Sequence, residues 1–137
     1  MLTPRELDDA TLLEQFENCS LHPNFFTHEN LLRLSWILIN KFGLKRAIVK
    51  NRTIKENYYK EVLKSDKYNI PLTIAYTEIL HHFMEKSQSN DFYKLLKEFP
   101  RLKYNFKLLV RTHYGYDILK EHRNNDVQVK RPILFTF

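Results

Sequence analysis

A small group of histidine, tyrosine, threonine and asparagine residues contains the side chains of this chain that are best suited to bind a ligand or move a proton. Imidazole rings ligate metals and exchange protons near neutral pH, whereas hydroxyl and amide groups orient ligands by hydrogen bonds. A tryptophan or tyrosine ring can form an apolar or stacking wall beside them. The candidate ligand contacts are His28, Asn69, Thr73, His113, Tyr68, Trp36 and Tyr114.

The two histidines of this group are expected at opposite ends of helices, which favours different charges on them. His28 follows Thr27, a capping residue type, and the positive end of the helix dipole favours a neutral imidazole that can ligate metal or accept a proton. His113 is expected near a helix C-terminus, where the dipole favours the charged form. Either residue can instead be purely structural, His28 as a cap or core-edge side chain and His113 as a partner of terminal carbonyls.

A metal site needs three or four converging ligands. His28 and His113, joined by Asp117 or Glu29, form only a small set, and no HxxxH or ExxH spacing links them. The neighbouring pair His81 and His82 points in directions about 100° apart on a helix and does not chelate. His28 and His113 are therefore kept as candidate metal ligands, and the sequence assigns no cofactor.

Helix start and stop signals define the elements that must position these residues. Thr3 and Glu6 match a capping box with Pro4 in the first turn, Thr27 can cap a second helix, and Gly43 is a typical helix end. Helices are expected over residues 4–18, 28–42, 44–65 with a loosened turn near Asn51, 71–86, 91–99 and 100–114. The chain from Asn124 is expected to be extended, with its apolar end, residues 133–135, docked on the body.

These elements predict an all-α fold in which residues 1–137 form a single-domain bundle of about five to six helices. The chain has 137 residues, 43% of them hydrophobic, which fits one domain with one core. Its two glycines argue against phosphate-binding loops and chains of tight β-hairpins. The second helix is apolar on nearly every face, which central burial or a homodimer interface would explain equally well.

Short connections between helices make neighbours antiparallel, and this topology predicts where the polar residues meet. If the second helix begins at one end of the bundle, the third ends there and the fourth begins there. With the fifth helix as a short connector, the sixth also ends there. We therefore expect His28, the turn at Tyr68 and Asn69, Thr73 and His113 to lie near one pole.

The charge distribution bears on nucleic acid as a partner. The net charge is +6, but residues 1–30 hold one base against six acids, and residues 31–137 hold 21 bases against 10 acids. A basic body can bind phosphates through counterion release. The bases are spaced like exposed helix positions, and no nucleic-acid module is present, so we do not expect this partner. With one cysteine, no long apolar run and no signal segment, we expect a soluble, cytoplasmic protein without membrane contact.

The sequence also resembles a family of small bacterial helical proteins of uncharacterised function. Its segments FTHENLLRLSW (26–36) and YNIPLTIAY (68–76) are similar to the family patterns F-x-H-x-x-H-L-R-L-A-W and Y-H-x-T-x-T-x-A-W. Further similarity lies in residues 100–102 and 108–114. The matching positions are His28, Leu32, Arg33, Leu34, Trp36, Tyr68, Thr73 and Ala75.

The departures from these patterns affect the chemistry that the resemblance implies. Leu31 and Asn69 stand where the family patterns have histidines, Pro71 replaces a threonine, and Tyr76 replaces a tryptophan. If family members use a histidine cluster for metal or acid–base chemistry, this chain lacks two members of it. The resemblance therefore implies a fold and a pocket location rather than an activity.

Three functions are carried forward. The first is a non-catalytic accessory protein that binds a small molecule or a protein partner in a polar pocket at one pole. The second is a histidine-dependent enzyme, with or without metal, in which His28 acts as base or ligand in the same pocket. The third is nucleic-acid binding through the basic body.

Overall fold

Proline, glycine and capping residues divide the chain into helices at most of the expected places. The computed structural model describes the backbone of residues 3–114 and the side chains of residues 3–112. The α-helices of this part are α1 (Asp9–Glu17), α2 (His28–Phe42), α3 (Leu44–Tyr58), α4 (Ile70–Lys86), α5 (Phe92–Glu98), α6 (Arg101–Tyr104) and α7 (Phe106–Tyr114). The described residues contain no strand, and the predicted all-helical, single-domain fold is confirmed. The expected docked tail and Gly115 lie outside the described residues.

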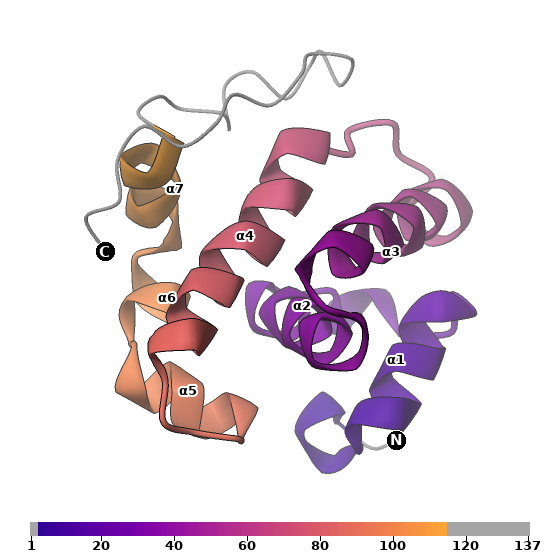
Figure 1. Ribbon diagram of the computed structural model, residues 1–137. Helices are drawn as coiled ribbons and strands as arrows, with labels where there is room; N and C mark the ends of the chain where they lie inside the picture. Colours follow the sequence, from indigo (N-terminus) through magenta and orange to yellow (C-terminus); the bar gives the residue numbers. More distant parts are fainter. Residues whose placement is uncertain (1–2, 115–137) are drawn as a thin grey trace.

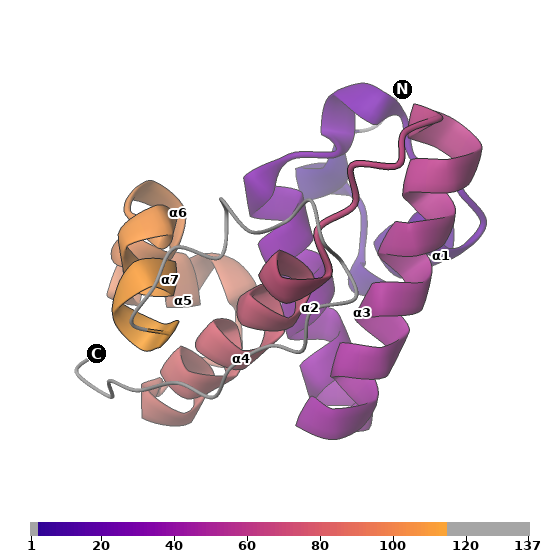
Figure 2. The same ribbon diagram turned by 90° about the horizontal axis from the view of Figure 1, so that it is seen from above.

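Helix α4 lies between two groups of helices (Figures 1 and 2). On one side α2 and α3 pack on each other and on α4, and α1 packs on both α2 and α3. On the other side the short helices α5, α6 and α7 follow one another, and α7 packs on α4. No helix of the described part is long and apolar enough to cross a lipid bilayer.

Helix α2 packs on α1, α3 and α4, and most of its apolar side chains are covered by its own chain. Its Thr27 cap accepts a hydrogen bond from the backbone N–H of Asn30, and its C-cap Gly43 has φ 80°, which favours glycine. Leu32, Leu34 and Leu38 are almost completely buried. Burial within the chain thus accounts for much of this apolar composition, and the homodimer interface stays a prediction.

The first helix differs from its prediction. In place of one helix over residues 4–18, a 3-10 turn (Pro4–Glu6) precedes α1, which Asp8 caps by accepting a hydrogen bond from the N–H of Thr11 at 2.7 Å. The expected capping box is wrong, because the Thr3 hydroxyl bonds the Glu6 carboxylate rather than a backbone N–H. The backbone turns here because two of its carbonyls face a buried side chain of α2.

That side chain is Arg33, whose residue is only 4% exposed. Its guanidinium donates to the carbonyl oxygens of Pro4 at 2.6 Å and Leu7 at 2.8 Å, and to the carboxylate of Asp9 at 2.9 Å. Tyr93 of α5 adds a ring face and a longer contact through its hydroxyl. A buried guanidinium is tolerated when its N–H groups are paired, and here they join α2 to the N-terminal segment.

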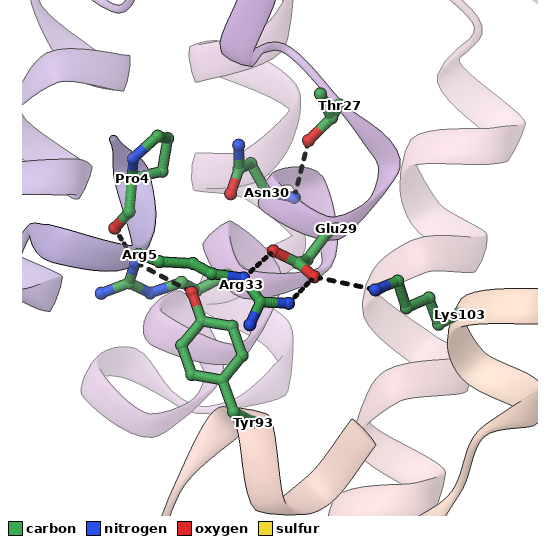
Figure 3. A network of polar contacts seen from close by, with 8 residues as sticks. All are labelled: Pro4, Arg5, Thr27, Glu29, Asn30, Arg33, Tyr93 and Lys103. Carbon is green, nitrogen blue, oxygen red and sulfur yellow. Dashed lines mark hydrogen bonds and ion pairs between the residues drawn. The ribbon is translucent and has the colours of Figure 1, made fainter. Parts of the chain in front are cut away.

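A second ion network lies beside the first. Glu29, in the first turn of α2, accepts hydrogen bonds from Arg5 at 2.6 Å and pairs with Lys103 of α6 at 3.3 Å (Figure 3). The network therefore connects the N-terminal 3-10 turn, α2 and α6. The Arg5 side chain is 59% exposed, so its contribution to stability is small.

Two further elements differ from expectation. Helix α3 continues without loosening through Asn51 and ends in a π-helical turn (Tyr59–Leu63), closed by Lys64 in the left-handed conformation. The helix expected over residues 100–114 is broken at Asn105 into α6 and α7, which adds one helix to the expected count.

We expect Arg33→Met to lower the free energy of unfolding by about 2–4 kcal/mol, because it leaves buried carbonyls without donors. Urea unfolding measures this loss. The matched control is Arg5→Met, which removes an exposed guanidinium and is expected to cost less than about 1 kcal/mol. Equal losses in the two variants would contradict the role given to Arg33.

Candidate functional site

Polar residues from α3 and α4 surround a small cavity at one pole of the bundle. We call it the Lys55 cavity, and its volume is about 60 Å³. Its polar lining consists of Lys55, Tyr59, Tyr68, Asn69, Thr73 and Tyr76, and its apolar lining of Phe26, Leu31 and Leu72. The cavity is partly open to the protein surface, and Tyr59, Asn69 and Leu72 of its lining are half-buried. Three residues predicted from the sequence, Tyr68, Asn69 and Thr73, therefore share one site.

Lys55 is the unusual residue of this cavity, because lysine side chains in most proteins are charged and exposed to water. Here the residue is 3% exposed, and its Nζ lies 4.3 Å from the centre of the Tyr76 ring. Within the described residues no carboxylate forms an ion pair with it. Burial lowers the pKa of Lys55 to about 7, so a large fraction of the amine is neutral at physiological pH.

The position of Lys55 follows from a polar junction one helical turn earlier. Asn51 is fully buried on the same face of α3, and its Nδ2 donates to Ser35 Oγ of α2 at 2.8 Å and to Thr77 Oγ1 of α4 at 3.0 Å. These bonds fix the register of the three helices. Lys55 lies four residues after Asn51, and Tyr76 immediately precedes Thr77. The two side chains therefore meet across the α3–α4 interface.

Aromatic rings line the end of the cavity where α3 ends. Tyr59 begins the π-helical turn, lies four residues after Lys55, and contacts the Tyr68 ring at a centroid distance of 5.6 Å. Burial raises the pKa of Tyr59 and of Tyr68, so both hydroxyls keep their protons at neutral pH. π-Helical turns occur often at functional sites, and this one contributes a residue to the cavity wall.

The three residues at the start of α4 also have local structural roles. The Asn69 side chain caps the helix by accepting from the N–H of Leu72 at 2.8 Å. The Thr73 hydroxyl donates to the Asn69 carbonyl, and the Tyr68 hydroxyl donates to the Arg52 carbonyl at 3.2 Å. The second half of the Asn69 amide is the group among them that a ligand can use.

His28 is held against Tyr76 at the edge of the site. Its Nδ1 lies 2.7 Å from the Tyr76 hydroxyl, and its Nε2 lies 2.8 Å from the Leu102 carbonyl oxygen. A carbonyl only accepts, so Nε2 carries the hydrogen and Nδ1 accepts from Tyr76. Burial lowers the pKa of His28 and favours this neutral form.

This arrangement determines what His28 can do. Both ring nitrogens are engaged within the protein, so His28 orients the Tyr76 ring that covers Lys55. The neutral form expected from the helix dipole agrees with the lowered pKa, although burial is its main cause. Among the described residues, no cluster of three histidine, cysteine or acidic side chains is placed to hold a metal ion.

A larger hollow adjoins the Lys55 cavity on the side of α7. We call it the outer hollow; its volume is about 530 Å³, and Leu72 and Tyr76 line both spaces. Phe106 stacks on Tyr76 with a centroid distance of 4.6 Å, and His28 lies against both rings. The start of α7 therefore meets His28 and Tyr76 through Phe106.

The other predicted site residues lie elsewhere. Trp36 lines a separate hollow beside Lys41 and Met84 and packs against Phe92, because it is two turns along α2 from His28. It is therefore not brought to the Lys55 cavity. His113 and Tyr114 belong to the last turn of α7, and their side chains lie outside the described part of the structure, as does Asp117.

Lys55 and Asn51 face inward although neither was predicted to, and the pattern of α3 contains a signal for both. Ala47, Asn51, Ile54, Lys55 and Tyr58 are all buried and follow helical spacing along one face of α3. A polar or charged residue inside such a stripe marks a buried polar group.

No family model, curated protein or solved structure matches this chain. The resemblance to the small bacterial family therefore stays a prediction.

We expect ¹⁵N chemical shifts of His28 to show a neutral ring with hydrogen on Nε2. Since the folded pKa lies below 6.5, the unfolded chain binds the extra proton first as the pH falls. The contribution of His28 to stability is thus present above about pH 6.5 and is lost as the pH falls toward the folded pKa. A charged ring at pH 6.5 would contradict this assignment.

We expect the free energy of unfolding to rise with pH between about 7 and 10, because the unfolded state keeps the Lys55 proton that the folded state releases. The upper limit is about 1.4 kcal/mol per pH unit. Urea unfolding at two pH values measures the slope. Lys55→Met is expected to remove this rise and to stabilise the protein at pH 7, whereas Lys60→Met, at an exposed position of the same helical segment, is expected to leave the slope unchanged.

Proposed function

We propose that this protein is a non-catalytic binding protein for a small molecule, which occupies the Lys55 cavity. The observation that carries the proposal is a buried lysine without a carboxylate partner among the described residues, facing a cavity that reaches the surface. Burying such a group lowers stability, and a ligand that pairs with it recovers the lost hydrogen bonds.

The lining indicates how a ligand would be oriented. Its oxygen atom would face Lys55, and the Asn69 amide would supply a further hydrogen bond near the start of α4. Its carbon atoms would contact the rings of Tyr59 and Tyr76. This distribution of polar and apolar groups matches a short molecule with one polar end.

The volume limits the size of the part that enters. About 60 Å³ is well below the roughly 150 Å³ of an apolar cavity that accepts benzene, so about three or four non-hydrogen atoms fit. At a ceiling of about 1.5 kcal/mol per atom, binding stronger than about 6 kcal/mol is not expected. The corresponding dissociation constants are roughly tens of micromolar or weaker.

The histidine-dependent enzyme is the less favoured alternative, because His28 already uses both nitrogens. Nucleic-acid binding is also less favoured, because the groups that distinguish this site are buried rather than arranged on a basic surface.

We expect 1-propanol or propionate, added to ¹⁵N-labelled protein, to shift the backbone amide signals of Tyr68, Asn69 and Thr73, which line the cavity. The saturation curve gives the affinity. Thr73→Ile fills the cavity and is expected to weaken binding at least tenfold. Thr53→Ile makes the same exchange at an exposed position of α3 and is expected to have no effect. If neither probe shifts these signals in the wild-type protein, the proposal is wrong.

A further inference from the structure

The Lys55 amine is a nucleophile in its neutral form, and the cavity contains what such a nucleophile needs. The amine is buried, faces a cavity that reaches the surface, and has no carboxylate among the described residues to keep it protonated. Desolvation of a lysine in an apolar pocket is an established way to activate it. Surface lysines, in contrast, are almost entirely protonated near neutral pH.

We propose that Lys55 captures a short aldehyde or ketone as a covalent imine within the cavity. This inference rests on the proposed function, because it names the chemical class of ligand for the same site. The polar end of the ligand is then its carbonyl group, and two or three carbon atoms fill the remaining space.

The chemical step balances without a cofactor or an oxidant. The lone pair of Nζ attacks the carbonyl carbon, a C–N bond forms, and the carbonyl π electrons move to the oxygen. Proton transfer from nitrogen to oxygen gives a carbinolamine, and loss of water leaves a C=N bond. The products are the imine and one water molecule, and the reaction consumes no oxidant or reductant.

Neighbouring groups suit each stage of this step. Tyr59 lies one turn after Lys55 and lines the cavity, and burial raises the pKa of its hydroxyl, so it remains an O–H donor for the developing oxygen. The Tyr76 ring face lies 4.3 Å from Nζ. A protonated imine places positive charge on the same nitrogen, and an aromatic face stabilises a cation there.

The position of the Tyr76 ring depends on His28 and Phe106. The hydrogen bond to His28 at 2.7 Å and the stacking on Phe106 hold the ring in place. Its hydroxyl is engaged by His28, and the ring face is what Tyr76 offers to the cation.

Reductive trapping tests the proposal. The full-length protein is incubated at pH 7 with propanal and cyanoborohydride, which reduces an imine to a stable propyl amine, and peptide mapping by mass spectrometry locates the label. We expect Lys55 to be labelled at least tenfold faster than exposed lysines such as Lys60, because its pKa of about 7 leaves far more neutral amine. Peptide mapping separates this label from one on the terminal amine.

Two lysine variants and the probes 1-propanol, propanal and propionate distinguish the possible outcomes. Lys60→Met should keep the label at residue 55, and Lys55→Met, which is expected to fold, should retain no preferentially labelled lysine. Labelling of Lys55 no faster than of Lys60 would overturn the imine. If 1-propanol and propanal shift the amide signals of Tyr68, Asn69 and Thr73 but no label forms, the imine is wrong and the proposed function stands. Shifts with propionate alone would overturn the imine in favour of a carboxylate site. If no probe produces a shift and no label forms, both proposals fail.

Discussion

The hydrogen bonds of Asn51 are the constraint on which the arrangement of this protein depends. One buried amide nitrogen joins α3 to Ser35 of α2 and to Thr77 of α4. Apolar side chains pack acceptably in several registers, whereas the buried amide nitrogen of Asn51 meets both hydroxyl acceptors only in one. Because Lys55 follows Asn51 by one turn and Tyr76 precedes Thr77, the register that pairs the amide nitrogen also places the lysine against the ring.

Two buried basic residues, Arg33 and Lys55, have different surroundings and therefore different roles. Arg33 is surrounded by carbonyl oxygens and Asp9, so its burial joins elements of the fold. Lys55 faces an aromatic ring and an open space, and no comparable set of acceptors surrounds it in the described residues. A guanidinium remains charged wherever it is placed, whereas an amine can lose its proton when it is buried. The first residue therefore suits a structural role and the second a chemical one.

The helices and the pole of the bundle could be predicted from the sequence because they depend on local signals. Gly43, Thr27 and the proline at the start of α4 mark helix ends, and short connections bring His28 and the start of α4 together. The N-terminal turn could not be predicted in this way, because its geometry depends on Arg33, more than twenty residues away in the sequence. Lys55 was missed for a different reason: composition indicates that a lysine is charged, but not whether water reaches it.

Recognition of the N-terminal segment by Arg33 has a consequence for how freely that segment can vary. The guanidinium contacts the main-chain oxygens of Pro4 and Leu7, and every residue type presents such an oxygen. The two main-chain contacts therefore do not depend on which side chains stand there, whereas the burial of Pro4 and the packing of Leu7 against the core do. One residue of α2 therefore fixes the course of the main chain here, while Asp8, Asp9 and the buried Pro4 of the segment supply the side-chain contacts.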